Sequence, residues 1–327
     1  MRKIKWGVLG TAYIFERDTA EGMRQAENCA LYAIAGRSME KAEAFKRKYG
    51  FEKAYGSYEE LIADPEVEAV YIPLPNTLHR EWTIRALNAK KHVLCEKPIA
   101  CTAAEAQEMF DAARANGVHL MEAFAYQHSP YIAEVKAEID RGTIGDVRYI
   151  EAALVTSDYL PSNIRMRRET CGGCTYDLGV YCMSFILRMM GKEPEMVQAV
   201  CEKSEEGVDL NTAVIMKFDN GARANFDCGM VLATEKNSSL SRFQIHGTEG
   251  SIEGVVFGFN MPGELRYRVQ TFAGVDEIKT VQVPQNYRLE VEQLGRCITD
   301  GETPSVSEAF SMANARTIDR ILKEIAY

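Results

Sequence analysis

Two short stretches carry side chains that could transfer protons. Residues 92–97 read HVLCEK, an apolar run that ends on Glu96 and Lys97. Further along, Asp177 and Tyr181 stand four residues apart in a helical pattern, so they should share one helical face. A phenol beside a carboxylate can work as an acid–base pair. The spacing alone leaves the alternative open, namely a first-turn acid that complements the helix dipole and a core tyrosine.

Lys97 should lie where a ligand binds. In an open parallel sheet, ligands bind beyond the carboxyl ends of the strands, and Lys97 ends an apolar strand just before Pro98. The alternative is a surface ion pair with Glu96, which would contribute little stability. Asn76 and His79 follow the preceding strand and are expected at the same edge. Asn76 could also cap the next helix, and His79 could face solvent.

The first strand-to-helix turn predicts a phosphate site. In GVLGTA, Gly7, Gly10, Thr11 and Ala12 are small enough for backbone N–H groups to approach a pyrophosphate at a helix N-terminus. The spacing departs from the stricter G-x-G-x-x-G fingerprint, so an ordinary tight turn is the alternative.

The second strand ends on Arg37 and Ser38 rather than on an acid. An acid there would accept the ribose 2′-hydroxyl of NAD, whereas an arginine beside a hydroxyl can hold a 2′-phosphate. The pattern therefore predicts NADP, with NAD less favoured. A solvated arginine is the alternative.

These residues need elements that position them. From residue 4 to about 124, short apolar strands alternate with amphipathic helices, which predicts a parallel sheet with right-handed crossovers. The strongest helical pattern is in 103–117, which Gly117 should end; its apolar positions are Ala106, Met109, Phe110 and Ala113.

The second half has a different pattern. Between residues 147 and 257, apolar runs are separated by turns, apart from one interrupting helical stretch, which predicts a mostly antiparallel sheet. Helices are expected near 130–141, 176–190, 286–299 and 306–325. We place the boundary so that the domains are residues 1–122 and 123–327.

Composition narrows the classes of partner. A length of 327 residues suits about two domains. The formal charge of -9 disfavours non-specific binding to nucleic acid or anionic lipid. No run approaches the ~20 apolar residues of a membrane span. The nine cysteines, scattered through expected strands and helices, fit reduced thiols in the cytoplasm better than a disulfide framework.

Nearly the whole chain resembles the glucose-fructose oxidoreductase and inositol dehydrogenase family, Gfo/Idh/MocA. The resemblance is carried by PNTLH, ALNAKKHVLCEKPIA and GGCTYDLGVY. GVLGTA, AGRS and the tyrosine of DLGVY resemble the NADP-using branch, with glucose-fructose oxidoreductase, D-xylose dehydrogenase and dimeric dihydrodiol dehydrogenases. The resemblance implies an α/β N-terminal Rossmann domain and an α+β C-terminal domain with a large, open, mostly antiparallel sheet. Family members commonly dimerise or tetramerise through that sheet.

The resemblance also implies residue roles. Lys97 matches the family's catalytic lysine, Tyr181 the proton-transferring tyrosine and Asp177 the substrate-binding acid. Arg165 matches an arginine near the cofactor, and the Lys97–Pro98 bond one that is often cis. A histidine replaces this tyrosine in inositol dehydrogenases, which weakens an inositol assignment.

The family's glycine triplet here reads Gly172, Gly173 and Cys174, and Cys171 precedes it. Two cysteines without clustered histidines provide too few ligands for a typical zinc site. We therefore expect no metal, and reduced thiols at Cys171 and Cys174.

The expected reaction is reversible oxidation of a sugar-like or related cyclic alcohol with NADP. Tyr181 would exchange the proton, Lys97 would favour the phenolate, and Asp177 would orient the substrate. Two alternatives keep the fold: a glycosidase that retains its dinucleotide, and a dinucleotide-sensing regulator that is not an enzyme. The sequence does not distinguish a pyranose aldose from a deoxy-sugar, an anhydro-sugar or a trans-dihydrodiol as substrate.

Overall fold

The computed structural model describes residues 2–157, 162–231, 239–255 and 262–327. The chain forms two compact units: the first contains residues 1–128 and 284–311, and the second contains 129–283 and 312–327. The first unit thus extends beyond the expected boundary at 122. It also includes a late segment that a single boundary does not provide.

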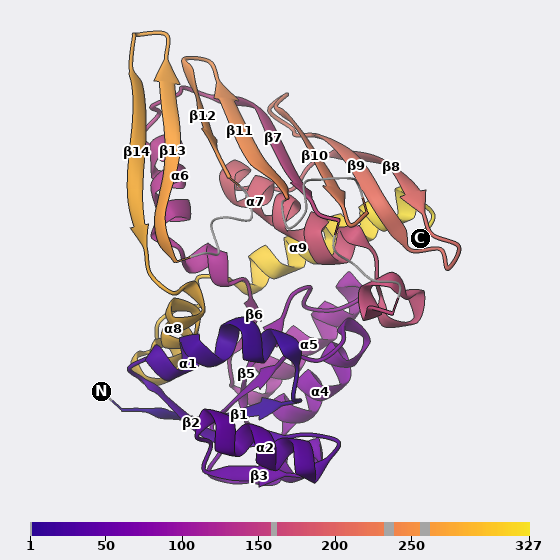
Figure 1. Ribbon diagram of the computed structural model, residues 1–327. Coiled ribbons are helices and arrows are strands. Elements are labelled where there is room, and N and C mark those ends of the chain that lie inside the picture. The colour runs from indigo at the N-terminus through magenta and orange to yellow at the C-terminus, as the bar shows by residue number, and fades with distance from the viewer. Residues whose placement is uncertain (1, 158–161, 232–238, 256–261) are drawn as a thin grey trace. The chain divides into compact units, whose positions relative to one another are not determined.

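The first unit is built on six parallel strands in the order β3-β2-β1-β4-β5-β6 (Figure 1). This is the Rossmann order, with its switch point between β1 and β4, and it confirms the predicted α/β domain. The strands are β1 Ile4–Leu9, β2 Cys29–Ala35, β3 Lys53–Tyr55, β4 Ala69–Ile72, β5 His92–Glu96 and β6 Leu120–Ala123. The helices are α1 Ala20–Gln25 after a π-helical turn at Phe15–Thr19, α2 Met39–Tyr49, α3 Tyr58–Ala63, α4 Asn76–Asn88, α5 Ala103–Asn116 and α8 Asn286–Asp300, with a short 3-10 turn at Ala125–His128.

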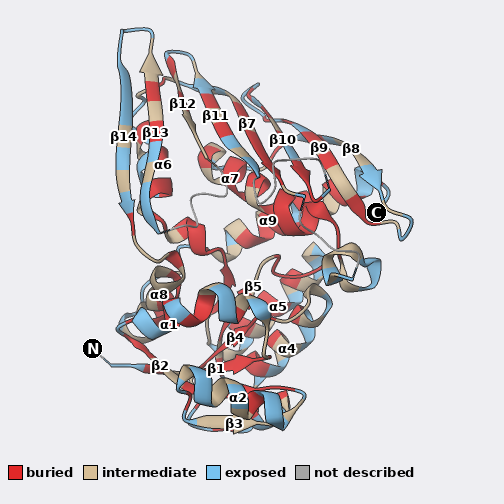
Figure 2. Cartoon of the chain, viewed as in Figure 1, coloured by how far each residue is buried: buried red, intermediate tan, exposed pale blue. Residues whose placement is uncertain are grey.

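Local sequence explains these elements well. All four residues of β4 are buried, as Figure 2 shows for the central strands, because helices cover both faces of a parallel sheet. Helix α5 begins where Thr102 accepts the N–H of Glu105 and ends at Gly117, whose φ is 65°. The helix predicted for 103–117 is confirmed, and its four predicted apolar residues are buried.

The second unit is built on eight strands in the order β14-β13-β12-β11-β7-β10-β9-β8. Among the strands that the structure describes here, only β7 and β10 pair in parallel, so the predicted mostly antiparallel sheet is confirmed. The strands are β7 Val147–Val155, β8 Met196–Lys203, β9 Asp209–Lys217, β10 Arg223–Gly229, β11 Leu240–Gly247, β12 Gly250–Gly254, β13 Gly263–Thr271 and β14 Asp276–Val283. The strand expected at 251–257 runs past β12, and its residues 256 and 257 lie outside the described ranges.

Helices α6 Pro130–Asp140 and α7 Val180–Met190 pack against this sheet. A π-helical turn at Thr175–Gly179 leads directly into α7, and α9 spans Glu308–Glu324. Two 3-10 turns, Ile164–Met166 and Arg168–Thr170, precede the π-helical turn.

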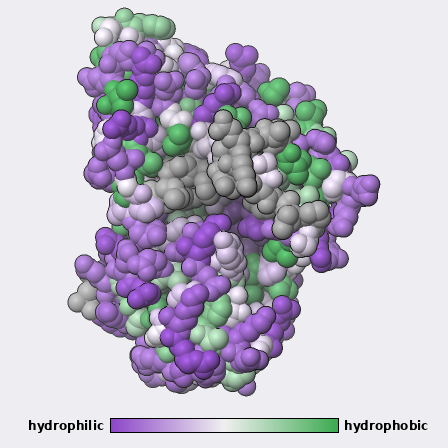
Figure 3. Space-filling model, in the orientation of Figure 1, coloured by the Kyte–Doolittle hydropathy of each residue, from purple (hydrophilic) through white to green (hydrophobic). Residues whose placement is uncertain are grey.

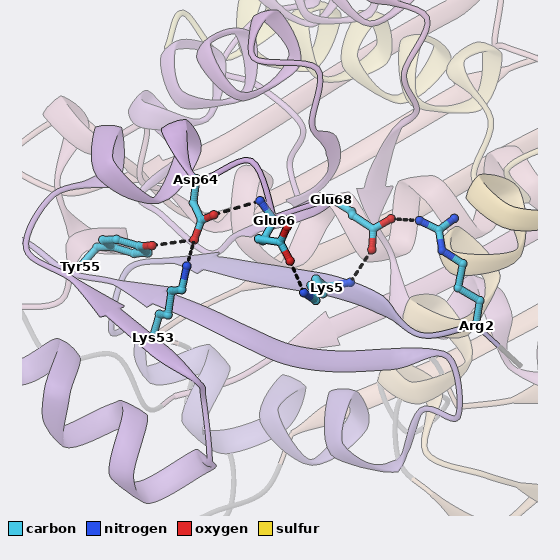
Figure 4. Close-up of polar contacts among 7 residues, drawn as sticks. All are labelled: Arg2, Lys5, Lys53, Tyr55, Asp64, Glu66 and Glu68. Carbon is cyan, nitrogen blue, oxygen red and sulfur yellow. Dashed lines mark hydrogen bonds and ion pairs between the residues drawn. The ribbon is translucent and has the colours of Figure 1, made fainter.

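A polar network closes the amino edge of the first sheet (Figure 4). Asp64 accepts hydrogen bonds from Lys53 at 2.8 Å and Tyr55 at 2.6 Å. Burial alone would raise the pKa of Asp64, but these bonds and that from the N–H of Glu66 hold it at about 2. Neighbouring ion pairs are Lys5 with Glu66 and Arg2 with Glu68. Because ligands bind at the opposite edge, this network serves the fold.

The face shown in Figure 3 is mainly hydrophilic, with only small groups of hydrophobic residues. Among the described helices, none has the length and apolar character that a membrane crossing requires.

Candidate active site

A pocket of about 410 Å³ lies at the carboxyl ends of β1, β2 and β4. It brings together five of the residues predicted to bind the cofactor. The lining residues are Gly10, Thr11, Ala12, Arg37, Ser38, Lys41, Tyr58, Pro73, Leu74 and Pro75.

The two glycines of the first turn have different reasons to be glycine. Gly10 lines the pocket with φ at 108°, a conformation that side chains with a Cβ rarely adopt. Gly7 lies within β1, and a Cβ there would come within 2.5 Å of Cδ2 of Leu61. Packing against α3 therefore explains the glycine at this position. We had expected Gly7 to line the pocket, and it does not.

The second strand leads into a basic rim of the pocket. Arg37 is exposed, and Ser38 caps α2 by accepting the N–H of Lys41 at 3.4 Å. Lys41, in the first turn of α2, also lines the pocket and was missed by the sequence reasoning, although its spacing of three residues from Ser38 could have indicated it. Burial raises the pKa of Tyr58, and the positive charge of Arg37 partly offsets this shift.

Lys97 lies half-buried at the end of β5, beside a buried hydrogen-bond chain. The hydroxyl of Tyr71 donates to Oε1 of Glu96 at 2.5 Å and lies 2.9 Å from the hydroxyl of Thr19. Glu96 also accepts the backbone N–H of Lys97 at 3.2 Å. Burial raises the pKa of Glu96, and Tyr71 and the charge of Lys97 only partly offset this. The Lys97–Pro98 bond is cis, as the family resemblance implied.

His79 lies between the loop that follows β4 and the loop that follows β5. Its side chain is fully buried, and its ring nitrogens lie 2.8 Å from the carbonyl oxygens of Leu74 and Pro98. Both nitrogens are therefore used by the backbone, which leaves neither for a ligand. His79 instead ties the loop after β4 to the loop that carries Lys97. For Asn76, the capping alternative does not hold, because Asn76 is the first residue of α4 and Pro75 precedes it as N-cap.

Two further buried acids surround this site and were missed. Glu122 on β6 accepts the N–H of Ile99 at 2.9 Å, and burial raises its pKa to about 7. Glu290 on α8 is buried, and neither carboxyl oxygen has a hydrogen-bond partner among the described residues. Its charge raises the pKa of Tyr71, and the charge of Glu96 raises the pKa of Glu290, so the three groups lie close together.

In the second unit, Asp177 and Tyr181 stand on one continuous helical segment. Asp177 lies in the π-helical turn and Tyr181 in the first turn of α7. Asp177 is largely buried, and its Oδ1 lies 2.8 Å from Nε of Arg165, so the structure pairs two predicted site residues. Tyr181 is half-buried. Because π-helical turns occur frequently at functional sites, the local geometry agrees with a role for this segment.

The cysteines give a mixed result. Cys174 is a buried free thiol, as expected, but the expectation is wrong for Cys171, which is disulfide-bonded. Within the described residues, no group of three or more His, Cys, Asp or Glu side chains is arranged to hold a metal ion.

Comparisons with known proteins agree with this geometry. The family model described as "Oxidoreductase family, NAD-binding Rossmann fold" matches residues 4–124, and the "GFO/IDH/MocA C-terminal domain" matches residues 132–253. The NADP(+)-dependent D-xylose 1-dehydrogenase 2 of Haloferax volcanii is 33% identical over 97% of this chain and 95% of its own length. The trans-1,2-dihydrobenzene-1,2-diol dehydrogenase of Xenopus tropicalis is 31% identical over 98% of both chains.

Among solved structures, the 3-ketoreductase KijD10 of Actinomadura kijaniata, in complex with NADP and TDP-benzene, superposes with a TM-score of 0.90. It is 27% identical, and the match covers 99% of this chain and 98% of that chain. The chain therefore belongs to the Gfo/Idh/MocA family of NAD(P)-binding oxidoreductases, and it is a dehydrogenase or reductase.

Proposed function

We propose that this protein transfers hydride between NADP and a sugar-like cyclic alcohol, with Tyr181 as acid–base group and Lys97 as its electrostatic partner. The single observation that most supports NADP is the rim of the pocket, where Arg37, Ser38 and Lys41 lie together. Two cations and a hydroxyl suit a 2′-phosphate dianion. The xylose dehydrogenase described above is named as NADP(+)-dependent, and the 3-ketoreductase was solved in complex with NADP, which supports the same choice.

The pocket fits the dinucleotide in its chemistry. The backbone of Gly10, Thr11 and Ala12 would hold the pyrophosphate at the start of the following helix. Arg37 and Lys41 would hold the 2′-phosphate. When bound, the nicotinamide supplies the hydride acceptor or donor at its C4 atom.

The proposed roles of the side chains follow from their chemistry. A free tyrosine has a pKa of ~10, too high for efficient base catalysis at neutral pH. The ammonium of Lys97 would favour the phenolate of Tyr181, which takes the proton from the substrate hydroxyl. Asp177 would accept a hydrogen bond from a neighbouring hydroxyl. Arg165 would hold the Asp177 carboxylate in place through the ion pair described above.

A panel of alcohols tests this proposal. D-Xylose, other pyranoses, anhydro-sugars and trans-dihydrodiols would each be offered with NADP and with NAD, and reduced nicotinamide would be followed by absorbance. Tyr181→Phe should lower turnover by roughly 10²- to 10⁴-fold while NADP binding stays intact. Tyr149→Phe, which removes a phenol from β7 in the same unit, is the control and should retain turnover.

Three outcomes would contradict the proposal. Unchanged turnover of Tyr181→Phe would remove the assigned acid–base group. Sugar release without net reduction of NADP would favour the glycosidase alternative. NADP binding without turnover of any alcohol would favour the regulator.

We also propose that the chain forms a homodimer or homotetramer through the outer face of the second sheet. The large apolar side chains exposed on its strands include Val200 on β8, Ile215 on β9 and Ile278 on β14, which are 72%, 54% and 67% exposed. Light scattering would give the mass, and Ile215→Lys with Val200→Lys should shift it towards the monomer. A monomeric wild-type chain would refute this.

A further inference from the structure

We infer that Asp209 and Tyr327 are positioning residues that hold the short turn at residues 172–175, from which Asp177 and Tyr181 are presented. This inference rests on the proposed function, since it concerns the side chains assigned there. The turn leads into the π-helical segment, which begins at Thr175, and Asp177 follows Thr175 by two residues. A small displacement of the turn would therefore move the substrate-binding carboxylate.

Asp209 holds the turn from the side of the sheet. It is the first residue of β9 and is fully buried. Its Oδ2 accepts the backbone N–H and the hydroxyl of Thr175, both at 2.7 Å. The hydroxyl of Thr212 donates to the same oxygen at 2.9 Å, and the thiol of Cys174 does so at 3.0 Å.

Four donors therefore converge on one carboxyl oxygen of Asp209. Hydrogen bonds to an ionised acceptor are roughly twice as strong as those between neutral groups. Burying an unpaired charge is costly, and the donors of the turn offset that cost. The carboxylate of Asp209 and the backbone of residues 174 and 175 therefore depend on one another.

The other carboxyl oxygen of Asp209, Oδ1, packs against Gly173. Gly173 has φ at 108°, and a Cβ there would lie 1.9 Å from Oδ1 of Asp209. The carboxylate thus fills the space that any other side chain at residue 173 would occupy. This contact explains why the second glycine of the motif is required, and it fixes the distance between the turn and β9.

Tyr327 anchors the other end of the turn, at Gly172. Its hydroxyl donates to the carbonyl oxygen of Gly172 at 2.8 Å. Its ring packs edge-on against Tyr176, with centroids 5.7 Å apart, and the guanidinium of Arg168 lies 4.7 Å from the ring centre. Asp209 binds residues 174 and 175, and Tyr327 binds residue 172, so both ends of the turn are anchored.

Asp209→Asn and Tyr327→Phe test this inference. Each substitution keeps the shape of the side chain, but the first removes the charge that four donors share and the second removes one hydroxyl. Because misplacement by about 1 Å can cost 10²-fold in rate, we expect kcat/KM for the alcohol to fall by roughly tenfold or more. KM for the alcohol should rise, while KM for NADP stays within about twofold of wild type.

Glu138→Gln is the matched control, because Glu138 is an equally buried acid of the second unit, 2% exposed on α6. If Asp209 only supported the fold, Asp209→Asn would behave like Glu138→Gln: less folded enzyme and lower apparent kcat, with both KM values unchanged. That result would overturn the inference. Thr175→Ser, which keeps the hydroxyl, should retain activity that Thr175→Val loses.

Amide hydrogen exchange separates this inference from the proposed function. Exchange at residues 172–181 should accelerate in Asp209→Asn and in Tyr327→Phe, while residues 130–140 keep their wild-type rates. This result would support the positioning role even if none of the alcohols were turned over, which would refute only the proposed function. Unchanged exchange at residues 172–181 in both variants would refute the positioning role.

Discussion

At the scale of single residues, cofactor choice depends on the rim formed by Arg37, Ser38 and Lys41. We predict that Arg37→Asp lowers the affinity for NADP by about 10- to 100-fold, because a charge-assisted contact worth about 1.5–3 kcal/mol is replaced by repulsion of the 2′-phosphate. The affinity for NAD should rise, since the new carboxylate can accept the ribose 2′-hydroxyl.

Titration calorimetry or fluorescence with each dinucleotide would measure this change. Lys46→Ala is a matched control, because Lys46 lies on the same helix but does not line the pocket. If wild type prefers NAD, or if Arg37→Asp leaves the preference unchanged, the assignment of the rim is wrong.

Glu290 gives a prediction about pH. Burial raises its pKa well above the usual value, and the charge of Glu96 raises it further. An acid whose pKa is raised in the folded state ionises at a lower pH in the unfolded chain than in the folded protein. The free energy of unfolding therefore falls as pH rises above 4.5, the ordinary pKa. Glu290→Gln should therefore raise Tm at pH 8 by roughly 2–4 °C, the shift that about 1 kcal/mol produces in a domain of this size. At pH 4 the two proteins should melt together.

Thermal unfolding followed by circular dichroism at both pH values would check this prediction. A lower Tm of Glu290→Gln at pH 8 would show that the ionised carboxylate is stabilised in the folded protein. The interpretation of Glu290 as a neutral buried acid would then be wrong.

At the scale of elements, one buried acid fastens α6 to the hairpin of β13 and β14. Glu138 accepts hydrogen bonds from Lys279 at 2.5 Å and from Thr143 at 2.7 Å, and Arg141 lies 2.9 Å away. Burial would raise the pKa of Glu138, but these partners outweigh it and lower the pKa to about 2.

The lowered pKa of Glu138 fixes the direction of a second pH effect. Its contribution to stability is complete above the ordinary value of 4.5 and is lost as pH falls towards 2. Glu138→Gln should cost about 1–3 kcal/mol at pH 7, and the difference from wild type should shrink at pH 3. Urea unfolding at the two pH values measures it, and an equal difference at both would contradict the assigned charge.

The sequence predicted elements where the pattern is local. The alternating strands and helices of the first unit and most strands of the second were visible because each buries its own apolar residues. The hairpin of β13 and β14 was missed because GELRYRVQT and DEIKTVQV carry charges on the exposed face of an edge pair. Strand β3 was missed because it has only three residues.

The site shows the same division. Gly10, Arg37 and Ser38 were predicted because turn chemistry and strand ends can be read locally. The structural role of His79 and the contacts of Asp209 depend on backbone carbonyls and donors that are far away in sequence. No local sequence pattern predicts those contacts. The π-helical turns were also not predicted, because the periodicity of an α-helix does not indicate them.

At the scale of the whole molecule, the first unit is assembled from two separate parts of the chain. Helix α8 packs against α1. The contact leaves no room for a side chain at Gly22, because a Cβ there would lie 2.6 Å from Cβ of Tyr287. Asn28, which is buried, donates to the carbonyl oxygen of Glu292 at 2.8 Å. The Rossmann sheet therefore depends on a helix that lies more than 150 residues beyond its last strand.

This dependence gives a prediction for the full-length protein. Gly22→Ala should destabilise the first unit by about 1–3 kcal/mol, because the added methyl group overpacks the contact between α1 and α8. Hydrogen exchange should accelerate in residues 286–300 and in α1, whereas strands β8 to β11 of the second unit keep their rates. Gly56→Ala is the control, since its nearest neighbour would be 3.6 Å away.

Saturating NADP should recover part of the lost Tm, because a ligand at 100 times its Kd adds about 2.7 kcal/mol to the state that binds it. Equal acceleration in both units would mean that they unfold as one cooperative body, and the independent response of the first unit would be refuted.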